Sequence, residues 1–440
     1  MTSLEKTAHR AIELLKKYQV SDYEISLGSS SGVSTVVRLG EVETLQHHLD
    51  KSFDVNVFFG KKKGHASSVD TSADSLEKTI ESACLIAKYT QDDPFNGLAA
   101  KELMAFDRPD LDLYHPWDLD AQHSIELAKA CEAIALEQAN IENSEGAEVS
   151  SSQGEGLYAN SNGLIATQNS TSHSLSCSLI AKRGDDMQTA YEYTTALDAS
   201  DLKTPQQVGE KAAKLAQQKL GAGSVESQKC PVIFTSRLSG GLFSSLLGAL
   251  SGASQYKKST FLLNSIDKIV LPEDISLSEN PFAQKTLGAK AMDRDGVLKR
   301  QQYFIANGRV KSFVMGQYSA NQLGLKTTAN AGGVNNVIVE SNFDGGLDAL
   351  IKTMDKGLVV TELMGQGVNG TTGDYSRGAL GFWVENGEIQ YPVSGLTIAG
   401  NLKEMLLGIV HVGNDVDNRN NIKVGSVLIN QMTIAGGADG

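Results

Sequence analysis

The fold of this chain of 440 residues is decided by a stretch that occurs in two versions. The first reads Phe53-Asp54-Val55-Asn56-Val57-Phe58-Phe59 and runs into Gly60-Lys61-Lys62. Apolar residues alternate with polar ones, which is the period of a strand with one buried face. The second version, Leu175-Ser176-Cys177-Ser178-Leu179, alternates in the same way and ends at Lys182-Arg183-Gly184. This similarity predicts an internal duplication.

Each version of the stretch lies between two amphipathic helices. The first unit begins with a Thr2…Glu5 capping box and closes with a helix whose apolar positions include Leu76 and Ile80. The second unit has a helix from about 118 to 139 and a closing helix that starts at Thr204-Pro205-Gln206-Gln207, with proline at the first helical position. We therefore expect α/β units at 1–92 and 118–222, joined by a linker at 93–117 that contains three prolines.

The region from 228 to 440 has a different pattern. A short apolar strand at Pro231–Phe234 is followed by a Gly/Ser/Leu helix at Leu238–Leu250. Farther on, Asn307-Gly308 and Asn386-Gly387 each separate two apparent strands, which is a strong local signal for a hairpin. The sequence predicts an α+β protein whose C-terminal domain is mostly antiparallel β, as a curved sheet or partial barrel.

Composition restricts the function classes. The chain has 39 Lys+Arg against 52 Asp+Glu and a net charge of −13, which argues against direct binding to nucleic acid. The four cysteines form no C-x-x-C pair and are expected as buried thiols in a reducing compartment. No apolar run reaches the roughly 18 residues that a membrane span needs, and the N-terminus resembles a helix cap. We expect a cytoplasmic protein that does not interact with membranes.

The local motifs do not form a complete catalytic apparatus. Gly365-Gln366-Gly367-Val368-Asn369-Gly370 matches a dinucleotide-binding pattern, but a hairpin is expected where that site needs a helix. Asp293-Arg294-Asp295-Gly296 resembles part of a calcium loop, yet its register places Ala291 and Gln302 at essential ligand positions, so a polar turn is expected. The stretch from His411 to Asp417 is the best mixed cluster of histidine and acids. A ligand role is open there, with a hydrogen-bonded turn as the default.

Three stretches resemble the TldD/PmbA family, which comprises the two related subunits of a bacterial cytosolic metalloprotease. The most specific stretch runs from Thr372-Gly373-Asp374-Tyr375-Ser376-Arg377-Gly378 to Asn386-Gly387 and on to Thr397-Ile398-Ala399-Gly400-Asn401. The others are Gly296-Val297 with Asn307–Ser312 and Leu323–Thr328, and Gly413-Asn414-Asp415 with Met432–Gly436. The likeness spans essentially the whole chain, and the duplicated first half fits the family's layout.

The resemblance also indicates which subunit type this is. The family's zinc-bearing subunit holds an H-E-x-x-x-H helix soon after the strand that opens the C-terminal domain. Here the matching positions are Ser244, Ser245 and Ala249, and no cysteine lies past Cys230 to supply the remaining zinc ligand. Zinc catalysis needs fixed protein ligands and an open position for water, which serine and alanine do not provide. The chain therefore resembles the PmbA (TldE) branch, with no catalytic or metal-binding residue of its own.

The resemblance implies a structural half of a heterodimeric peptidase, inactive alone, whose zinc lies on a TldD-like partner. Its substrates would be unfolded peptides, such as leader segments and antitoxin-type proteins, held at exposed strand edges of the β-rich half. Candidate residues for lining the shared chamber or contacting peptide are Asp374, Tyr375, Ser376, Arg377, His411 and Asp415. The alternatives are a peptide-binding or scaffold homodimer, or an indirect modulator of DNA gyrase.

Overall fold

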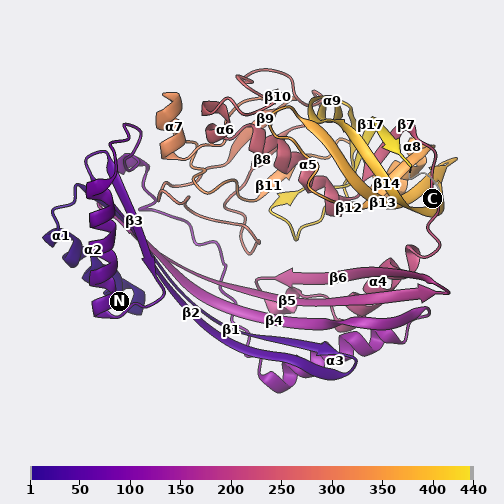
Figure 1. The fold of residues 1–440 in the computed structure, drawn as a ribbon, viewed down its shortest axis with the longest axis horizontal. Coiled ribbons are helices and arrows are strands. Elements are labelled where there is room, and N and C mark those ends of the chain that lie inside the picture. Colours follow the sequence, from indigo (N-terminus) through magenta and orange to yellow (C-terminus); the bar gives the residue numbers. More distant parts are fainter. Residues whose placement is uncertain (1, 437–440) are drawn as a thin grey trace.

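A computed structural model describes residues 2–436, and its N-terminal half is built on one long, curved sheet (Figure 1). The first unit contains α1 (Ser3–Lys17), β1 (Asp22–Arg38), β2 (Glu41–Phe59), β3 (Lys62–Ser68) and α2 (Ala73–Tyr89). The second contains α3 (Ala121–Leu136), β4 (Ile141–Asn160), β5 (Ile165–Arg183), β6 (Asp186–Ala196) and α4 (Pro205–Gln218). The predicted duplication is therefore present, and we call the two units the first and second repeats.

The two repeats share a single antiparallel sheet of order β3-β2-β1-β4-β5-β6. This order is symmetric about the β1–β4 pair, so β2 and β5 occupy equivalent places. Figure 1 shows the helices on the convex side of the sheet and the C-terminal region on its concave side. Beneath the helices, Phe53 and Val55 lie in the core of the first repeat, while Leu175 and Cys177 lie in the core of the second.

Residues 93–117, which we call the strap, connect the repeats and follow an ordered path. They include the short 3-10 helix η1 (Lys101–Leu103). The strap contacts the C-terminal region where the N–H of Ala105 donates to the carbonyl of Gly296 at 3.0 Å. It contacts the sheet where the N–H of Thr171 donates to the carbonyl of Leu113, also at 3.0 Å. Backbone hydrogen bonds thus fix a segment that has no helical or strand period.

The C-terminal region contains two further sheets. The first has the order β10-β9-β8-β11-β16, and the second has the order β14-β13-β12-β7-β17-β15 with an extra pairing between β14 and β17. That extra pairing closes five strands of the second sheet into a small barrel. The hairpin residues Asn307, Gly308, Asn386 and Gly387 all have positive φ, as their turns require. The predicted α+β class is confirmed, although β7 and β12 pair in parallel.

The bounds of the elements in this region are as follows. The strands are β7 (Gln228–Phe234), β8 (Leu277–Glu279), β9 (Gln302–Ala306), β10 (Arg309–Val310), β11 (Val337–Val339), β12 (Gly357–Met364), β13 (Asp374–Glu385), β14 (Glu388–Asn401), β15 (Ile409–Val412), β16 (Ile422–Lys423) and β17 (Val427–Ala435). The helices are α5 (Ser236–Ala249), α6 (Gly252–Tyr256), α7 (Gln317–Leu323), α8 (Leu347–Met354) and α9 (Leu402–Leu407). Within residues 2–436, no helix combines the length and the apolar character that a membrane crossing requires.

Candidate functional site

A groove of about 520 Å³ runs along one face of α5. Its floor consists of Arg237, Gly240, Gly241, Ser244 and Gly248, whose spacing of three or four residues places them on one side of the helix. A Cβ atom added at Gly241 or Gly248 would meet nothing within 4 Å. The opposite wall is formed by Val314, Gly333, Val334 and 420–422. The glycines therefore leave a flat, open floor over which a chain segment could pass.

The three degenerate zinc-motif positions lie on α5 but do not converge. Ser244 is exposed in the groove, whereas Ser245 is half-buried and its hydroxyl donates to the carbonyl of Gly241 at 3.0 Å. Ala249 is only 4% exposed and packs in the core. Two hydroxymethyl groups and a buried methyl group do not fit a zinc ion, which binds imidazole, thiolate or carboxylate. Among residues 2–436, no three or more His, Cys, Asp or Glu side chains gather in a way that could hold a metal ion.

The mouth of the groove is joined to the second repeat by a cluster of charged side chains. Glu192 of β6 has a side chain that is only 4% exposed. It accepts from Arg237 of α5 at 3.2 Å and from Arg419 of the loop before β16 at 2.6 Å. Arg237 also lies over the ring of Tyr191, and Arg419 lies over the ring of Tyr193. One buried carboxylate thus fixes two arginines from the C-terminal region against the sheet.

Asp417 completes this cluster. Its carboxylate accepts from the Nε of Arg419 at 2.9 Å and from Nη2 at 2.6 Å. Burial alone would raise the pKa of Asp417, but the hydrogen bonds from Arg419 outweigh it and hold the pKa below its usual value. The same hydrogen bonds raise the pKa of Arg419. Asp417 and Arg419 therefore stay a charged pair throughout the neutral range.

The segment Asp374–Arg377 begins β13 and lies away from the groove. Asp374 is exposed and accepts from the hydroxyl of Thr372 at 2.6 Å, which lowers its pKa. Tyr375 is buried with its ring edge-on to Phe234, and burial raises its pKa to about 12. The Nε of Arg377 is buried and has no hydrogen-bond partner among residues 2–436. The segment thus contains one exposed acid, one anchoring ring and one unsatisfied donor.

The other predicted cluster, from His411 to Asp417, begins at β15. The ring of His411 packs against Phe343 with 4.5 Å between the ring centroids, and its buried Nδ1 has no hydrogen-bond partner in the described part of the chain. Asp415 accepts from the backbone N–H and the hydroxyl of Ser426, eleven residues farther along the chain, so these bonds tie the stretch to the residues before β17. β13 and β15 are not neighbours in the sheet. Of the six predicted chamber residues, none lines the α5 groove.

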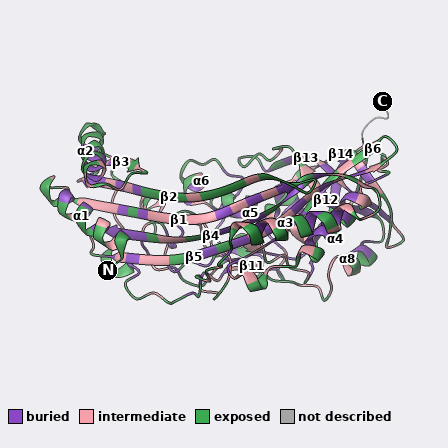
Figure 2. Cartoon of the chain, turned by 90° about the horizontal axis from the view of Figure 1, so that it is seen from below, coloured by how far each residue is buried: buried purple, intermediate pink, exposed green. Residues whose placement is uncertain are grey.

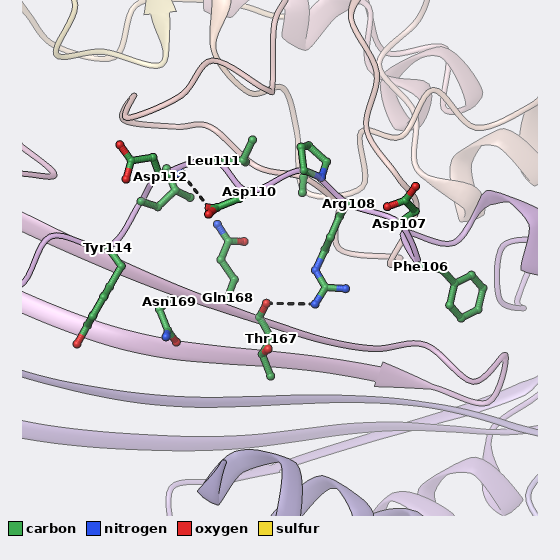
Figure 3. Close-up of a pocket in the computed structure, with 13 residues that line it drawn as sticks. Phe106, Asp107, Arg108, Asp110, Leu111, Asp112, Tyr114, Thr167, Gln168 and Asn169 are labelled. Carbon is green, nitrogen blue, oxygen red and sulfur yellow. Dashed lines mark hydrogen bonds between the residues drawn. The ribbon is translucent and has the colours of Figure 1, made fainter. Parts of the chain in front are cut away.

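A second cavity, of about 570 Å³, lies between the strap and β5 (Figure 3). Asp107, Arg108, Asp110 and Asp112 of the strap lie above Thr167–Asn169 of β5 in this view. The guanidinium of Arg108 donates to the carbonyl of Thr167 at 3.4 Å. The cavity is polar and carries three carboxylates against one guanidinium.

The sequence analysis missed Glu192, Arg237 and Arg419, as well as this strap cavity. The floor of the α5 groove carried a usable signal, because glycines and serines recur at three- and four-residue spacing from Gly240 to Ser251. The turn Asp293–Gly296 was expected to be a polar turn. The structure has a turn there, since the N–H of Gly296 donates to the carbonyl of Asp293 at 3.2 Å. The turn is buried, because Asp293 is 6% exposed and a Cβ placed on Gly296 would lie 2.5 Å from the ring of Tyr158.

Known proteins resemble the whole chain. Sequence profiles of the PmbA/TldA metallopeptidase family match domain 1 at residues 23–87, the central domain at 114–220 and the C-terminal domain at 227–436. The chain is 44% identical to a protein of Escherichia coli O157:H7 named Metalloprotease PmbA, over 98% of this chain and 96% of that protein. It is 42% identical to a PmbA homologue of Haemophilus influenzae, over 98% and 96% of the two chains.

Solved structures show the same fold. A crystal structure from Bacteroides thetaiotaomicron, described as a candidate modulator of DNA gyrase, superposes with a TM-score of 0.93 at 27% identity and covers 99% of both chains. The structure of TldE from Thermococcus kodakarensis has a TM-score of 0.82 at 22% identity, covers 98% of this chain and 100% of that chain, and supports the fold alone. With these matches over its entire length, the chain belongs to the PmbA/TldD family of metallopeptidases.

Proposed function

We propose that this chain is the zinc-free subunit of a cytoplasmic two-subunit metallopeptidase that trims or degrades unfolded peptides. The observation that carries the proposal is the floor of the α5 groove, where serine and glycine occupy the helix face that would have to present metal ligands. A hydrolytic zinc ion needs several fixed protein ligands, and water activation also needs a positioned base. The zinc and the base would therefore come from a TldD-like homologue.

In this proposal the chain supplies walls and contacts for the peptide. The α5 groove has the flat floor that an extended backbone needs, and Asp374–Arg377 and His411–Asp415 are the proposed contact segments. Two observations favour a role for these segments. Buried polar side-chain atoms normally have a partner, yet the Nε of Arg377 and the Nδ1 of His411 have none among the described residues.

The test mixes the purified chain with a zinc-bearing TldD-type homologue and measures cleavage of an unstructured peptide, with and without a chelator. Cleavage should require both chains and should stop with chelator, while metal content should follow the homologue. Gly248→Phe should fill the groove without touching the core, because a Cβ there meets nothing within 4 Å. We expect this variant to lower cleavage by the mixture.

Leu407→Phe is the matched control, because it adds an aromatic ring at an exposed position of α9 outside the groove. It should leave cleavage unchanged. Chelator-sensitive cleavage by this chain alone, or stoichiometric metal bound at Ser244–Ala249, would contradict the proposal.

A second candidate function is a homodimer that binds peptides or acts as a scaffold. It is favoured by residues 41–52 of β2, whose outer edge pairs with no other segment among residues 2–436. An indirect effect on DNA gyrase would be compatible with either function, whereas a net charge of −13 disfavours direct contact with DNA. Tight binding of gyrase or DNA by the purified chain, without a homologue, would favour this second candidate.

A further inference from the structure

Residues 41–52 of β2 form a strand edge with no neighbour on its outer side. β1 pairs with β2 along its whole length, whereas β3 pairs only with Phe53–Phe59. Within residues 2–436, no backbone hydrogen bond reaches the outer side of 41–52. Figure 2 shows β2 at the rim of the sheet with exposed residues along its middle. A free edge of this length offers a template for another strand.

The direction of the backbone groups follows from the β2–β3 hairpin. Phe59 and Lys62 face each other across a two-residue loop, and such a closing pair exchanges both backbone hydrogen bonds. Phe58 points the other way, because its carbonyl accepts from Ser21 beside β1 at 2.8 Å. Counting back by twos, Leu45, His47, Leu49 and Lys51 direct their N–H and C=O groups to the open side.

The equivalent edge in the second repeat is covered. β6 pairs with β5 only from His173 onward, so residues 165–172 of β5 extend past their neighbour just as 41–52 of β2 do. There the strap lies along the edge, with the N–H of Thr171 bonded to Leu113 and the carbonyl of Thr167 bonded to Arg108. The same fold thus accepts an extended segment at this place in one repeat and lacks one in the other.

The side chains along the free edge are self-complementary: in an antiparallel pairing of two copies, apolar residues would face apolar residues and an acid would lie near a base. Leu45 is 41% exposed and Leu49 is 70% exposed, and their odd-numbered positions place both on the helix-bearing face with Phe53. An antiparallel pairing centred on His47 sets Leu45 opposite Leu49 of the second copy. It also brings Glu43 near Lys51 of the second copy, although a bulge at 42–44 shifts this outer pair.

We propose that residues 41–52 of β2 are the contact surface for a second copy of this chain, paired antiparallel about His47. The two sheets would then join into one continuous sheet of twelve strands, and the four leucines would form a shared apolar patch. A two-fold pairing of this kind uses the same surface on both copies. The inference rests on the second candidate function, the homodimer, and does not depend on the proposed peptidase role.

The experiment measures mass by sedimentation and native mass spectrometry over about a hundredfold range of concentration, because dimerisation follows mass action. The wild-type chain should pass from monomer to dimer. A Leu45→Lys/Leu49→Lys variant should place lysines opposite lysines and raise the dimer dissociation constant at least about tenfold. A Leu45→Glu/Leu49→Glu variant should fail in the same way, and a mixture of the two should dimerise.

Hydrogen exchange gives a second readout. Dimerisation of the wild-type chain should slow exchange of the amides in 41–52 and leave the strap-covered edge at 165–172 unchanged. Circular dichroism of each variant checks folding, which exposed substitutions should preserve. A wild-type chain that stays monomeric overturns the proposal. This holds even if a peptide or a zinc-bearing homologue slows hydrogen exchange in 41–52, because the edge would then bind a different partner. Variants that dimerise separately as well as the wild type overturn it too.

Discussion

The two repeats have the same topology but meet the C-terminal region through opposite chemistry. At the second repeat, Glu192 accepts from two arginines, so the junction is a set of opposite charges. At the first repeat, the acids Glu24 and Asp295 lie near each other, and burial raises the pKa of both although Lys63 lies 3.9 Å from Glu24. The difference shows that two repeats can keep the same topology while each contacts the rest of the protein through different side chains.

The repeats also differ in their cores. The first repeat packs large side chains, including Phe53, Leu76 and Ile80, between the sheet and its helices. Half of the buried residues in the second core are alanine or cysteine and the rest are valine or leucine. A Cβ added at Gly209 of α4 would lie 2.6 Å from the carbonyl of Cys131 in α3. Small residues thus allow α3 and α4 to approach closely. The first core should be sensitive to lost volume and the second to added volume.

The largest effect is expected in the core of the first repeat. Phe53 is fully buried, so Phe53→Ala should lower the free energy of unfolding by about 4 kcal/mol through lost contacts and a cavity. Cys177→Ala in the second repeat removes one sulfur from an equally buried place and should cost about 1 kcal/mol. Denaturant unfolding measures both values. Equal costs would contradict the proposed difference between the cores.

Next comes the opposite-charge junction. Glu192→Ala leaves Arg237 and Arg419 partly buried without their shared carboxylate, and should cost about 3 kcal/mol in unfolding free energy. Thermal and denaturant unfolding would record the loss. Glu81→Ala, at an exposed position of α2, is the control and should change stability by less than about 0.5 kcal/mol.

The acids at the first-repeat junction, Asp295 and the neighbouring Asp293, should make the free energy of unfolding depend on pH. Burial and the neighbouring Asp295 raise the pKa of Asp293 to about 7, well above the value of about 3.9 in an unfolded chain. Between these two pKa values the folded state binds a proton that the unfolded state releases. The contribution is therefore complete below about pH 4 and is lost as the pH rises through 7, which amounts to about 3 kcal/mol between pH 4.5 and 7.5.

Unfolding of the wild type and Asp293→Asn at pH 4.5 and 7.5 tests this expectation. The substitution should remove most of the fall in stability with pH. Asp107→Asn, at an exposed position of the strap, should leave the pH dependence as it is. A pH dependence that persists unchanged in Asp293→Asn would show that another group carries it.

The smallest effect concerns two helical glycines. Gly209→Ala should cost about 2 kcal/mol, because backbone atoms of α3 must move to admit the methyl group. Gly241→Ala in α5 should instead gain about 0.5 kcal/mol, since the new Cβ meets nothing within 4 Å and alanine favours a helix. Opposite signs in thermal unfolding would support the close packing of α3 on α4.

Local patterns predicted the elements better than their connections. Alternation at Phe53–Phe59 identified β2, and the Asn-Gly pairs identified two hairpins, because these signals are encoded within a few residues. The middle of β1, Ser29-Ser30-Ser31-Gly32, has no apolar alternation, so nothing local indicated that the repeats share one sheet. The strap has no apolar period either, so the sequence did not indicate that it is ordered. Its order comes from hydrogen bonds to distant segments, such as the one between Thr171 of β5 and Leu113.

The candidate site was predictable only in part. The helix from 238 to 250 was expected, and the absence of histidine from it is a direct sequence fact. The cluster at the groove mouth was not visible, because Glu192 lies 45 residues from Arg237 and 227 from Arg419 in the chain. Likewise, a polar turn was expected at Asp293–Gly296, but sequence spacing does not report that Asp293 is buried there.

The ion pairs of Glu192 with Arg237 and Arg419 have a consequence for protein engineering. Its carboxylate belongs to one half of the chain and both guanidinium groups belong to the other, so these two ion pairs form only when the halves are combined. Chimeras that graft the first 222 residues of a homologue onto this C-terminal region should assemble only when the donor supplies an acid at the same place on its last strand. Whether two such regions from different homologues assemble would thus depend on one side chain at the interface between them.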